Sequence, residues 1–494
     1  MAELTILRGD ERLVRPFAPP QPLSAVLAAA GLSPQQPCGG RGVCGKCAVT
    51  LSGSVSEPNA AERRAGARLA CQAVLTGDAE VRLPIDRPME QIAADGALTL
   101  QAARPMEGRY GAAADIGTTT VVLKLFDLKT GACVGEAGML NPQTAVAADV
   151  MGRIGAALQG ALPALRAQIR GALASLLQTA CRGAGIEPES VSSAVVTGNT
   201  TMLYLLTGRS PEPLSHAPFE ADCLFDELRT EEGRAVYLPP CMHAFVGADI
   251  TCAVLAAGQC DSGAVSLLCD IGTNGELALW KDGTLWVTST AAGPAFEGAG
   301  ISCGCGSVRG AIDRVWAQDD MLCAHTIGGA PAVGVCGSGL IDAVAAGLSL
   351  ELIDETGAME LDSLALRDGI ALQPADIRAV QLAKAAIAAG IETLLETAGV
   401  APEAVETFYI AGGFGSHLNA GSAAAIGLIP EALVPRSRVL GNAALSGAAA
   451  LLLDTALQAR VRAIAGCARH VNLGGNPRFN EHYMEQMLFP EAEL

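Results

Sequence analysis

The sequence predicts an α/β protein in which two similar α/β lobes follow a small module of mixed α and β structure. Three observations favour this fold. The first 84 residues hold a glycine-rich group of cysteines, an apolar run ending in D-I-G-T occurs twice, and two strand–Gly-Asn–helix segments accompany those runs. Self-similarity over such a distance indicates an internal duplication.

Length and composition limit the function classes. The 494 residues suggest about three units. The 33 Lys and Arg against 51 Asp and Glu give a net charge of -18, which argues against binding nucleic acid through overall charge. The chain shows no signal-peptide pattern and no uninterrupted 18-residue apolar run, so we expect no membrane span. The 16 cysteines then indicate reduced thiols or metal ligands in a cytoplasmic protein.

Four of the cysteines form a spaced group. Cys38, Cys44 and Cys47 follow a C-x5-C-x2-C pattern, and Cys71 comes 24 residues later, with glycines between the thiols. Glycines between the thiols allow backbone N–H groups to come close to a charged group. Four thiolates in such a segment suit a polynuclear iron–sulfur centre. The surrounding segments predict a hairpin around residue 9, a helix over 22–31 and strands at 47–53 and 80–84.

Two other interpretations compete for this segment. Zinc accepts four cysteines, but its structural sites usually pair them in two short knuckles. Residues 40–46 read G-x4-G-K, yet Cys47 stands where a phosphate loop needs Ser or Thr. Residues 1–84 resemble the [2Fe-2S] ferredoxins of the plant and vertebrate types, and this resemblance implies a β-grasp fold with these four cysteines as cluster ligands. Residues 85–108 are interpreted as a linker, with a short strand at 97–101.

The duplicated motif places an acid and a tight turn on each of two hairpins. Residues 110–127 carry Asp115 and Gly117, and residues 266–280 carry Asp270 and Gly272. Such a turn presents backbone N–H groups and hydroxyls to phosphate, and its Asp can hold hydrated Mg²⁺ or orient an attacking water. The segments 193–206 and 438–453 share a strand–Gly-Asn–helix form and are interpreted as the partners of the two hairpins.

A third element contains a strand followed by glycines. Residues 406–418 predict a buried strand, then Gly412, Gly413 and Gly415, where bare backbone can lie against a nucleoside. A Rossmann interpretation fails because the glycines read G-G-x-G.

These elements together resemble the superfamily of acetate and sugar kinases, heat-shock ATPases and actin. The resemblance implies two ribonuclease-H-like lobes, 109–265 and 266–494, that bind ATP and Mg²⁺. It also implies which residues form each part. The first phosphate site is Asp115, Gly117, Thr118 and Thr119, and the second is Asp270, Gly272, Thr273 and Asn274. The glycines Gly412, Gly413 and Gly415 contact adenosine, and Gly198 and Gly441 lie in the connections between the lobes.

A cluster and an ATPase on one chain indicate an ATP-driven electron donor, because hydrolysis that changes a conformation can drive transfer to an acceptor of low potential. Nearly the whole chain resembles the ATP-dependent reductive activators of corrinoid proteins. That family implies reduction of Co(II) to Co(I) in a corrinoid protein of anaerobic methyl transfer, an upstream reductant such as ferredoxin, and no nucleic acid or membrane partner. A homodimer is also expected. Two segments depart from the family pattern, 147–149 and 302–313.

Several residues and functions stay open at this point. Glu297 either positions the hydrolytic water or is an ordinary loop acid, and Asp249 either faces Mg²⁺ or caps a helix. Cys303, Cys305 and Cys336 are interpreted as buried thiols rather than a second metal site. The alternative functions are electron donation to another low-potential iron–sulfur enzyme and redox-sensing nucleotide-binding regulation. We also expect basic residues near the cluster ligands to dock on an acidic surface: Arg41, Lys46, Arg63, Arg64 and Arg68.

Overall fold

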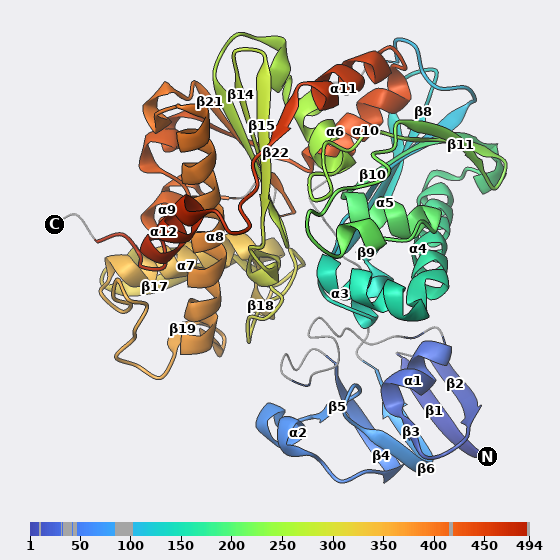
Figure 1. The fold of residues 1–494 in the computed structure, drawn as a ribbon. Coiled ribbons are helices and arrows are strands. Elements are labelled where there is room, and N and C mark those ends of the chain that lie inside the picture. The colour runs from blue at the N-terminus through green and yellow to red at the C-terminus, as the bar shows by residue number, and fades with distance from the viewer. Residues whose placement is uncertain are drawn as a thin grey trace. The chain divides into compact units, whose positions relative to one another are not determined.

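The computed structural model describes residues 1–8, 11–30, 32, 42, 47–83, 102–413 and 418–491. The chain separates into two compact units, Met1–Pro88 with Pro142–Ala156, and Met89–Asn141 with Ala157–Leu494. Figure 1 shows the elements of both units. No helix within the described ranges is long and apolar enough to cross a membrane.

The N-terminal unit contains a mixed sheet in the order β2-β1-β6-β4-β5, with β3 paired to β6. The β1–β2 pair is antiparallel and β1 runs parallel to β6, and the buried core includes Leu4, Leu27 and Leu69. The predicted strands and helix of this module are confirmed, whereas the turn at 9–10 and the strand at 97–101 lie outside the described residues. Its elements are β1 Ala2–Arg8, β2 Glu11–Phe17, β3 Gln21–Pro22, α1 Leu23–Ala29, β4 Ala48–Val55, α2 Ala60–Ala65, β5 Arg68–Leu69 and β6 Val74–Arg82, with α3 Val150–Ala156 in the same unit.

The second unit contains two six-stranded sheets of the same plan. One has the order β11-β12-β10-β7-β8-β9 and the other β22-β21-β13-β14-β15-β23. In each, the D-I-G-T motif joins an antiparallel pair, β7–β8 or β13–β14, and the first strand has a parallel neighbour, β10 or β21. The predicted duplication is therefore confirmed. The strands are β7 Tyr110–Ile116, β8 Thr120–Asp127, β9 Cys133–Leu140, β10 Val191–Gly198, β11 Glu227–Glu231, β12 Arg234–Leu238, β13 Ser266–Ile271, β14 Gly275–Lys281, β15 Thr284–Thr290, β21 Thr407–Gly412, β22 Ser437–Gly441 and β23 Ala468–His470.

One detail of the predicted repeat is wrong. The two Gly-Asn segments are not counterparts, because β10 pairs with β7 while β22 pairs with β21 rather than β13. The counterpart of Gly198 is Gly412. Both have positive φ, and a Cβ on either would lie 2.7 Å from Ile116 O or 2.3 Å from Ile271 O. Each glycine is needed because the backbone of the D-I-G-T strand passes directly beside it.

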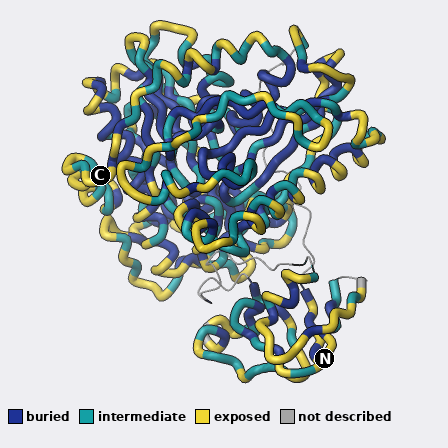
Figure 2. The backbone as a smooth tube through the Cα atoms, turned by 45° about the vertical axis from the view of Figure 1, so that its right-hand side comes forward, coloured by how far each residue is buried: buried dark blue, intermediate teal, exposed yellow. Residues whose placement is uncertain are grey.

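Helices from each half of the second unit cover the sheet of the other half. Helix α6 (Ala248–Ala257) packs in the core of the second sheet with Leu268 and Val287, while α10 (Ala443–Leu453) packs in the core of the first sheet with Ala113 and Val195. The two helices cross at Gly447, where a Cβ would lie 2.0 Å from Cys252 O. Figure 2 shows buried residues, in dark blue, gathered in the interior of this unit. The two lobes are thereby joined by an exchange of helices.

The remaining elements complete the second unit. Helices α7 and α8 line the far side of the second sheet's core, and α12 packs on α8. A three-stranded sheet, β17-β16-β18, precedes α7, and a small hairpin, β19–β20, follows it. The elements are α4 Leu162–Ala184, α5 Thr200–Thr207, β16 Ala311–Gln318, β17 Met321–Thr326, β18 Gly334–Val335, α7 Gly337–Ser349, β19 Leu364–Arg367, β20 Ile370–Leu372, α8 Pro374–Ala398, α9 Ala420–Ala425, α11 Leu457–Gly466 and α12 Pro477–Glu485.

Candidate cluster and nucleotide sites

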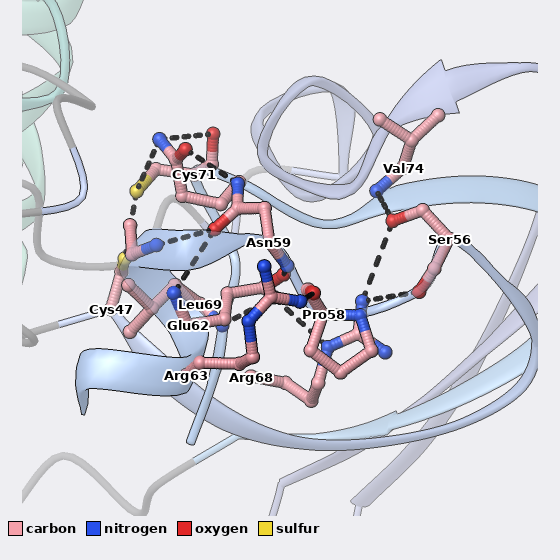
Figure 3. Close-up of polar contacts among 12 residues, drawn as sticks. Cys47, Ser56, Pro58, Asn59, Glu62, Arg63, Arg68, Leu69, Cys71 and Val74 are labelled. Atoms are coloured by element: carbon pink, nitrogen blue, oxygen red, sulfur yellow. Dashed lines mark hydrogen bonds and ion pairs between the residues drawn. The ribbon is translucent and has the colours of Figure 1, made fainter. Parts of the chain in front are cut away.

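Two of the four predicted cluster ligands meet in the N-terminal unit. The Sγ atoms of Cys47 and Cys71 lie 3.2 Å apart (Figure 3), whereas Cys38 and Cys44 lie outside the described residues. Cys47 directly precedes β4, and Cys71 follows the short strand β5, which pairs with β4. Two thiols that meet at one point, one of them directly after a glycine-rich segment of the sequence, fit the donor set of an iron–sulfur cluster. The described residues alone contain no group of three metal-binding side chains.

A buried carboxylate organises the chain between these two cysteines. Glu62 accepts hydrogen bonds from the Nε atom of Arg68 at 2.9 Å and from the backbone N–H groups of Asn59 and Leu69. Burial alone would raise the pKa of Glu62, but the hydrogen bonds from Arg68 and the two backbone groups outweigh burial and lower it. Arg68 is thus committed to an internal ion pair, contrary to its expected place on a basic docking surface.

The two D-I-G-T hairpins face each other in the second unit. The hydroxyl oxygens of Thr119 and Thr273 lie 2.9 Å apart, and both groups contact Oε2 of Glu297, Thr119 at 2.7 Å. Glu297 ends a 3-10 turn over Pro294–Glu297 that follows β15. The structure therefore brings one predicted residue from each phosphate site onto the predicted water-positioning acid. The chemistry of this donor set, hydroxyls and carboxylates around glycine turns, fits a phosphate and a hydrated cation.

The predicted glycines take distinct places. A Cβ at Gly117 would lie 2.7 Å from Thr120 O, so this turn tolerates no side chain, whereas Gly272 has its nearest atoms at 3.6 Å or beyond. Gly412 ends β21, and no atom of the described residues lies within 4 Å of the Cβ position of Gly413. Gly415 lies outside the described residues, as does His417. The open backbone at Gly413 is compatible with close approach of a ligand.

Four carboxylates on four elements share this region and perturb one another. Burial raises the pKa of Asp115 to about 6, and burial together with the charges of Asp115 and Glu297 raises the pKa of Asp270 to about 7. Burial together with the charges of Asp115 and Asp270 raises the pKa of Asp249, on α6. Glu276 lies on β14 opposite Asp270, and burial together with the charges of Asp249 and Asp270 raises its pKa. Like charges held together in low-dielectric surroundings attract a cation or protons. Asp249 is not a helix cap, because Gly247 takes that position.

Two asparagines that sequence reasoning missed fix the first hairpin. The Oδ1 atom of Asn442 caps α10 by accepting from the N–H of Leu445, and its Nδ2 donates to Asp115 at 3.1 Å. Asn199 likewise caps α5, and its Nδ2 donates to Thr118 Oγ1 at 3.0 Å. Their signal in the sequence is the Asn that follows Gly in each Gly-Asn segment. Capping fixes which way each amide points, so the site receives a donor of defined orientation.

The three additional cysteines lie near one another along the backbone. Val335 exchanges hydrogen bonds with Cys303 and Cys305, and Cys336 is the N-cap residue of α7, with its Sγ directed to Ile312 O at 3.3 Å. Within the described ranges no group of metal-binding side chains forms around them. Cys336 is buried as predicted, whereas the prediction of buried thiols is wrong for Cys303 and Cys305, which are only partly buried.

Three protein-family models match this chain and together cover most of it. Residues 10–76 match the 2Fe-2S iron–sulfur cluster binding domain, residues 110–261 match the RACo middle region, and residues 264–494 match the C-terminal domain of RACo, the ASKHA domain. The fold and the two sites therefore define an iron–sulfur protein that carries an ASKHA ATPase domain. This confirms the expected fold class, a [2Fe-2S] ferredoxin module before duplicated lobes.

Similar proteins identify the family. The corrinoid activation enzyme RamQ of Eubacterium limosum is 33% identical over 77% of this chain and 70% of its own length. The Co(II) methylated amine-specific corrinoid protein reductase of Methanosarcina barkeri is 29% identical over 51% of each chain. A solved reductive activator for a corrinoid, iron–sulfur protein superposes on the whole chain with a TM-score of 0.74 at 26% identity. The chain belongs to the RACo family, as its resemblance implied.

Proposed function

We propose that this protein reductively activates a corrinoid protein in an ATP-dependent reaction, delivering one electron that converts Co(II) to Co(I). The contact of Thr119 and Thr273 with Glu297 is the observation that carries the proposal for the ATPase. It joins both phosphate hairpins through one acid, so occupation of the site by nucleotide can change how the two lobes meet. Membership in the RACo family supports the proposal that a corrinoid protein accepts the electron.

Each predicted site residue receives a role under this proposal. Cys38, Cys44, Cys47 and Cys71 hold the [2Fe-2S] cluster, which when bound supplies one-electron transfer at low potential. Thr118, Thr119, Thr273 and Asn274, with the backbone of Gly117 and Gly272, bind phosphates, and Gly412, Gly413 and Gly415 lie against adenosine. Asp115 and Asp270 hold hydrated Mg²⁺ through water, and Glu297 orients the hydrolytic water. Asp249 and Glu276 add negative charge that favours the cation.

The organisation and surroundings of the protein are part of the same proposal. The chain is divided into the ferredoxin-like domain 1–84, a linker 85–108, and lobes 109–265 and 266–494. A reductant such as ferredoxin supplies the electron in a cytoplasmic system of anaerobic methyl transfer, and the protein acts as a homodimer without nucleic acid or membrane partners.

One anaerobic experiment tests the proposal. The reconstituted protein is mixed with a reductant and a Co(II) corrinoid protein, with and without MgATP, and the Co(I) absorption band is followed. We expect Co(I) only with MgATP, none with Cys71→Ser, and unchanged formation with Cys133→Ser, an exposed cysteine outside both sites. Co(I) formation that does not depend on ATP would contradict the proposal.

A further inference from the structure

The side chain that follows Cys71 points back toward the sulfur of that cysteine. Gln72 Nε2 lies 3.5 Å from Cys71 Sγ and 3.4 Å from Cys71 O. The second atom of the amide, Oε1, accepts a hydrogen bond from Asn59 Nδ2 at 2.9 Å. Figure 3 labels Cys71 and Asn59, the two residues that these contacts involve besides Gln72.

The orientation of this amide follows from backbone groups that can only donate. The N–H groups of Ala61 and Glu62 both bond one side-chain atom of Asn59, at 2.9 and 3.0 Å, so that atom is the carbonyl oxygen. The other atom of Asn59 is then the amide nitrogen, and its partner on Gln72 is the oxygen. The remaining atom of Gln72, the one that faces Cys71 Sγ, is therefore an N–H donor.

The rest of the module holds both amides in place. Asn59 caps α2 in a capping box in which Glu62 bonds back to the Asn59 N–H, and Glu62 is itself fixed by Arg68. A Cβ at Gly42, whose φ is +70°, would lie 2.9 Å from Gln72 Cδ, so Gly42 packs directly against the Gln72 side chain. The amide of Gln72 is thus packed between the capped helix and Gly42.

We propose that Gln72, positioned by Asn59, donates an N–H···S hydrogen bond to the cluster ligand Cys71 and raises the reduction potential of the [2Fe-2S] cluster. This inference rests on the proposed function, in which Cys71 is a ligand. Hydrogen bonds to the sulfurs are one of the factors that set such potentials, because a donor stabilises the more negative, reduced state. Gln72 and Asn59 are positioning residues and hold no metal themselves.

The test is a redox titration of the full chain, monitored by visible absorption and EPR, with iron and sulfide measured in the same samples. Gln72→Met removes the donor at similar side-chain length. Asn59→Asp keeps the capping oxygen but presents a second acceptor to Gln72, which turns the Gln72 oxygen toward Cys71. For both variants we expect about a tenfold higher ratio of oxidised to reduced cluster at fixed potential, equivalent to a midpoint about 59 mV lower.

The control is Gln21→Met, the same exchange at an exposed position of β3 in the same module, which should leave the potential unchanged. Normal iron content with an unchanged potential in both Gln72→Met and Asn59→Asp would overturn the inference. Loss of the cluster from both variants, with Gln21→Met intact, would also overturn it by showing a role in assembly. A wild-type chain that binds no [2Fe-2S] cluster would instead refute the proposed function.

Discussion

Thr119 and Thr273 come from different lobes and from positions 154 residues apart, yet their hydroxyl oxygens lie 2.9 Å from each other. They are not equivalent residues of the repeat, since Thr273 corresponds to Thr118 and Thr119 corresponds to Asn274 in the aligned D-I-G-T motifs. The duplicated hairpins therefore meet asymmetrically. A single acid, Glu297, can then serve both hairpins without a counterpart in the first lobe.

Replacing Glu297 by Gln should lower the rate constant of ATP hydrolysis by about 100-fold, the lower end of the range for a general base or water-positioning acid. The amide keeps an acceptor for Thr119 and Thr273, so binding of nucleotide should change much less than turnover. Steady-state phosphate release and nucleotide titration measure the two effects. Glu360→Gln, at an exposed position, is the control, and full hydrolysis by Glu297→Gln would exclude the role assigned to this acid.

Replacing Asn442 by Ala should lower both stability and activity. The variant loses the cap of α10 and the hydrogen bond to Asp115, which together are worth about 1–2 kcal/mol of unfolding free energy. ATP hydrolysis should fall as well, because Asp115 loses its orienting donor. Asn419→Ala removes the cap of α9 and should cost about 1 kcal/mol while hydrolysis persists. Denaturant unfolding and hydrolysis assays compare the pair; equal activity in both variants would show that Asn442 only caps.

The nucleotide-free protein should become less stable as pH rises from about 4 to about 7. The folded pKa values of Asp115 and Asp270, about 6 and about 7, lie above the unfolded value of 3.8. The folded state therefore binds more protons than the unfolded state between those values, and it loses this advantage as pH rises. Each such proton changes the unfolding free energy by about 1.4 kcal/mol per pH unit.

The measurement is the thermal midpoint as a function of pH, with and without MgATP. Asp249→Asn removes one of the repelling charges and should both raise the midpoint at pH 8 and flatten its pH dependence. MgATP should stabilise the wild type more at pH 8 than at pH 6. A midpoint that is independent of pH, or that rises with pH equally in both proteins, would contradict this account of the carboxylates.

Replacing Gly447 by Ala should destabilise the protein by about 1–3 kcal/mol or more, because the added methyl group would lie 2.0 Å from Cys252 O and force α6 and α10 apart. Gly171→Ala is the matched control in the exposed middle of α4, where no atom lies within 4 Å of the Cβ position. That exchange should stabilise the helix by up to about 1 kcal/mol. Equal effects of the two substitutions, measured by chemical denaturation, would exclude a tight helix crossing.

Much of the architecture follows from local sequence signals. The alternation on either side of Asp115 and Asp270 predicts both hairpins, and the interleaved cysteines and glycines predict the N-terminal module. The equivalence of Gly198 with Gly412 is not visible in the sequence, because it depends on which strand lies beside which backbone. The exchange of α6 and α10 is hidden for the same reason, since both helices are simply apolar and small-residue-rich.

The polar network of the sites is predictable only in part. Motifs indicate Thr119 and Thr273, but the arrival of Glu297 between them depends on the path of the loop after β15. Asn442 and Asn59 carry ordinary helix-cap signals, and nothing local shows that their free amide groups reach Asp115 and Gln72. Sequence patterns show only one of the two hydrogen bonds that such an amide makes. The bond to the helix N-terminus has a fixed spacing along the chain, whereas the bond from Nδ2 reaches a residue at no fixed spacing.

The helix exchange has a consequence for biosynthesis. The first sheet is complete once Leu238 has been made, but the helix that covers Ala113 and Val195 ends at Leu453, more than 200 residues later. Until α10 leaves the ribosome, that apolar face lacks most of its native cover, since α6 contributes only Cys252 and Leu255 to this core, and the first lobe cannot finish folding on its own. The long sequence separation makes this a slow, late step. Truncation before α10 should therefore expose the first lobe to chaperones and proteases, however intact its own residues are.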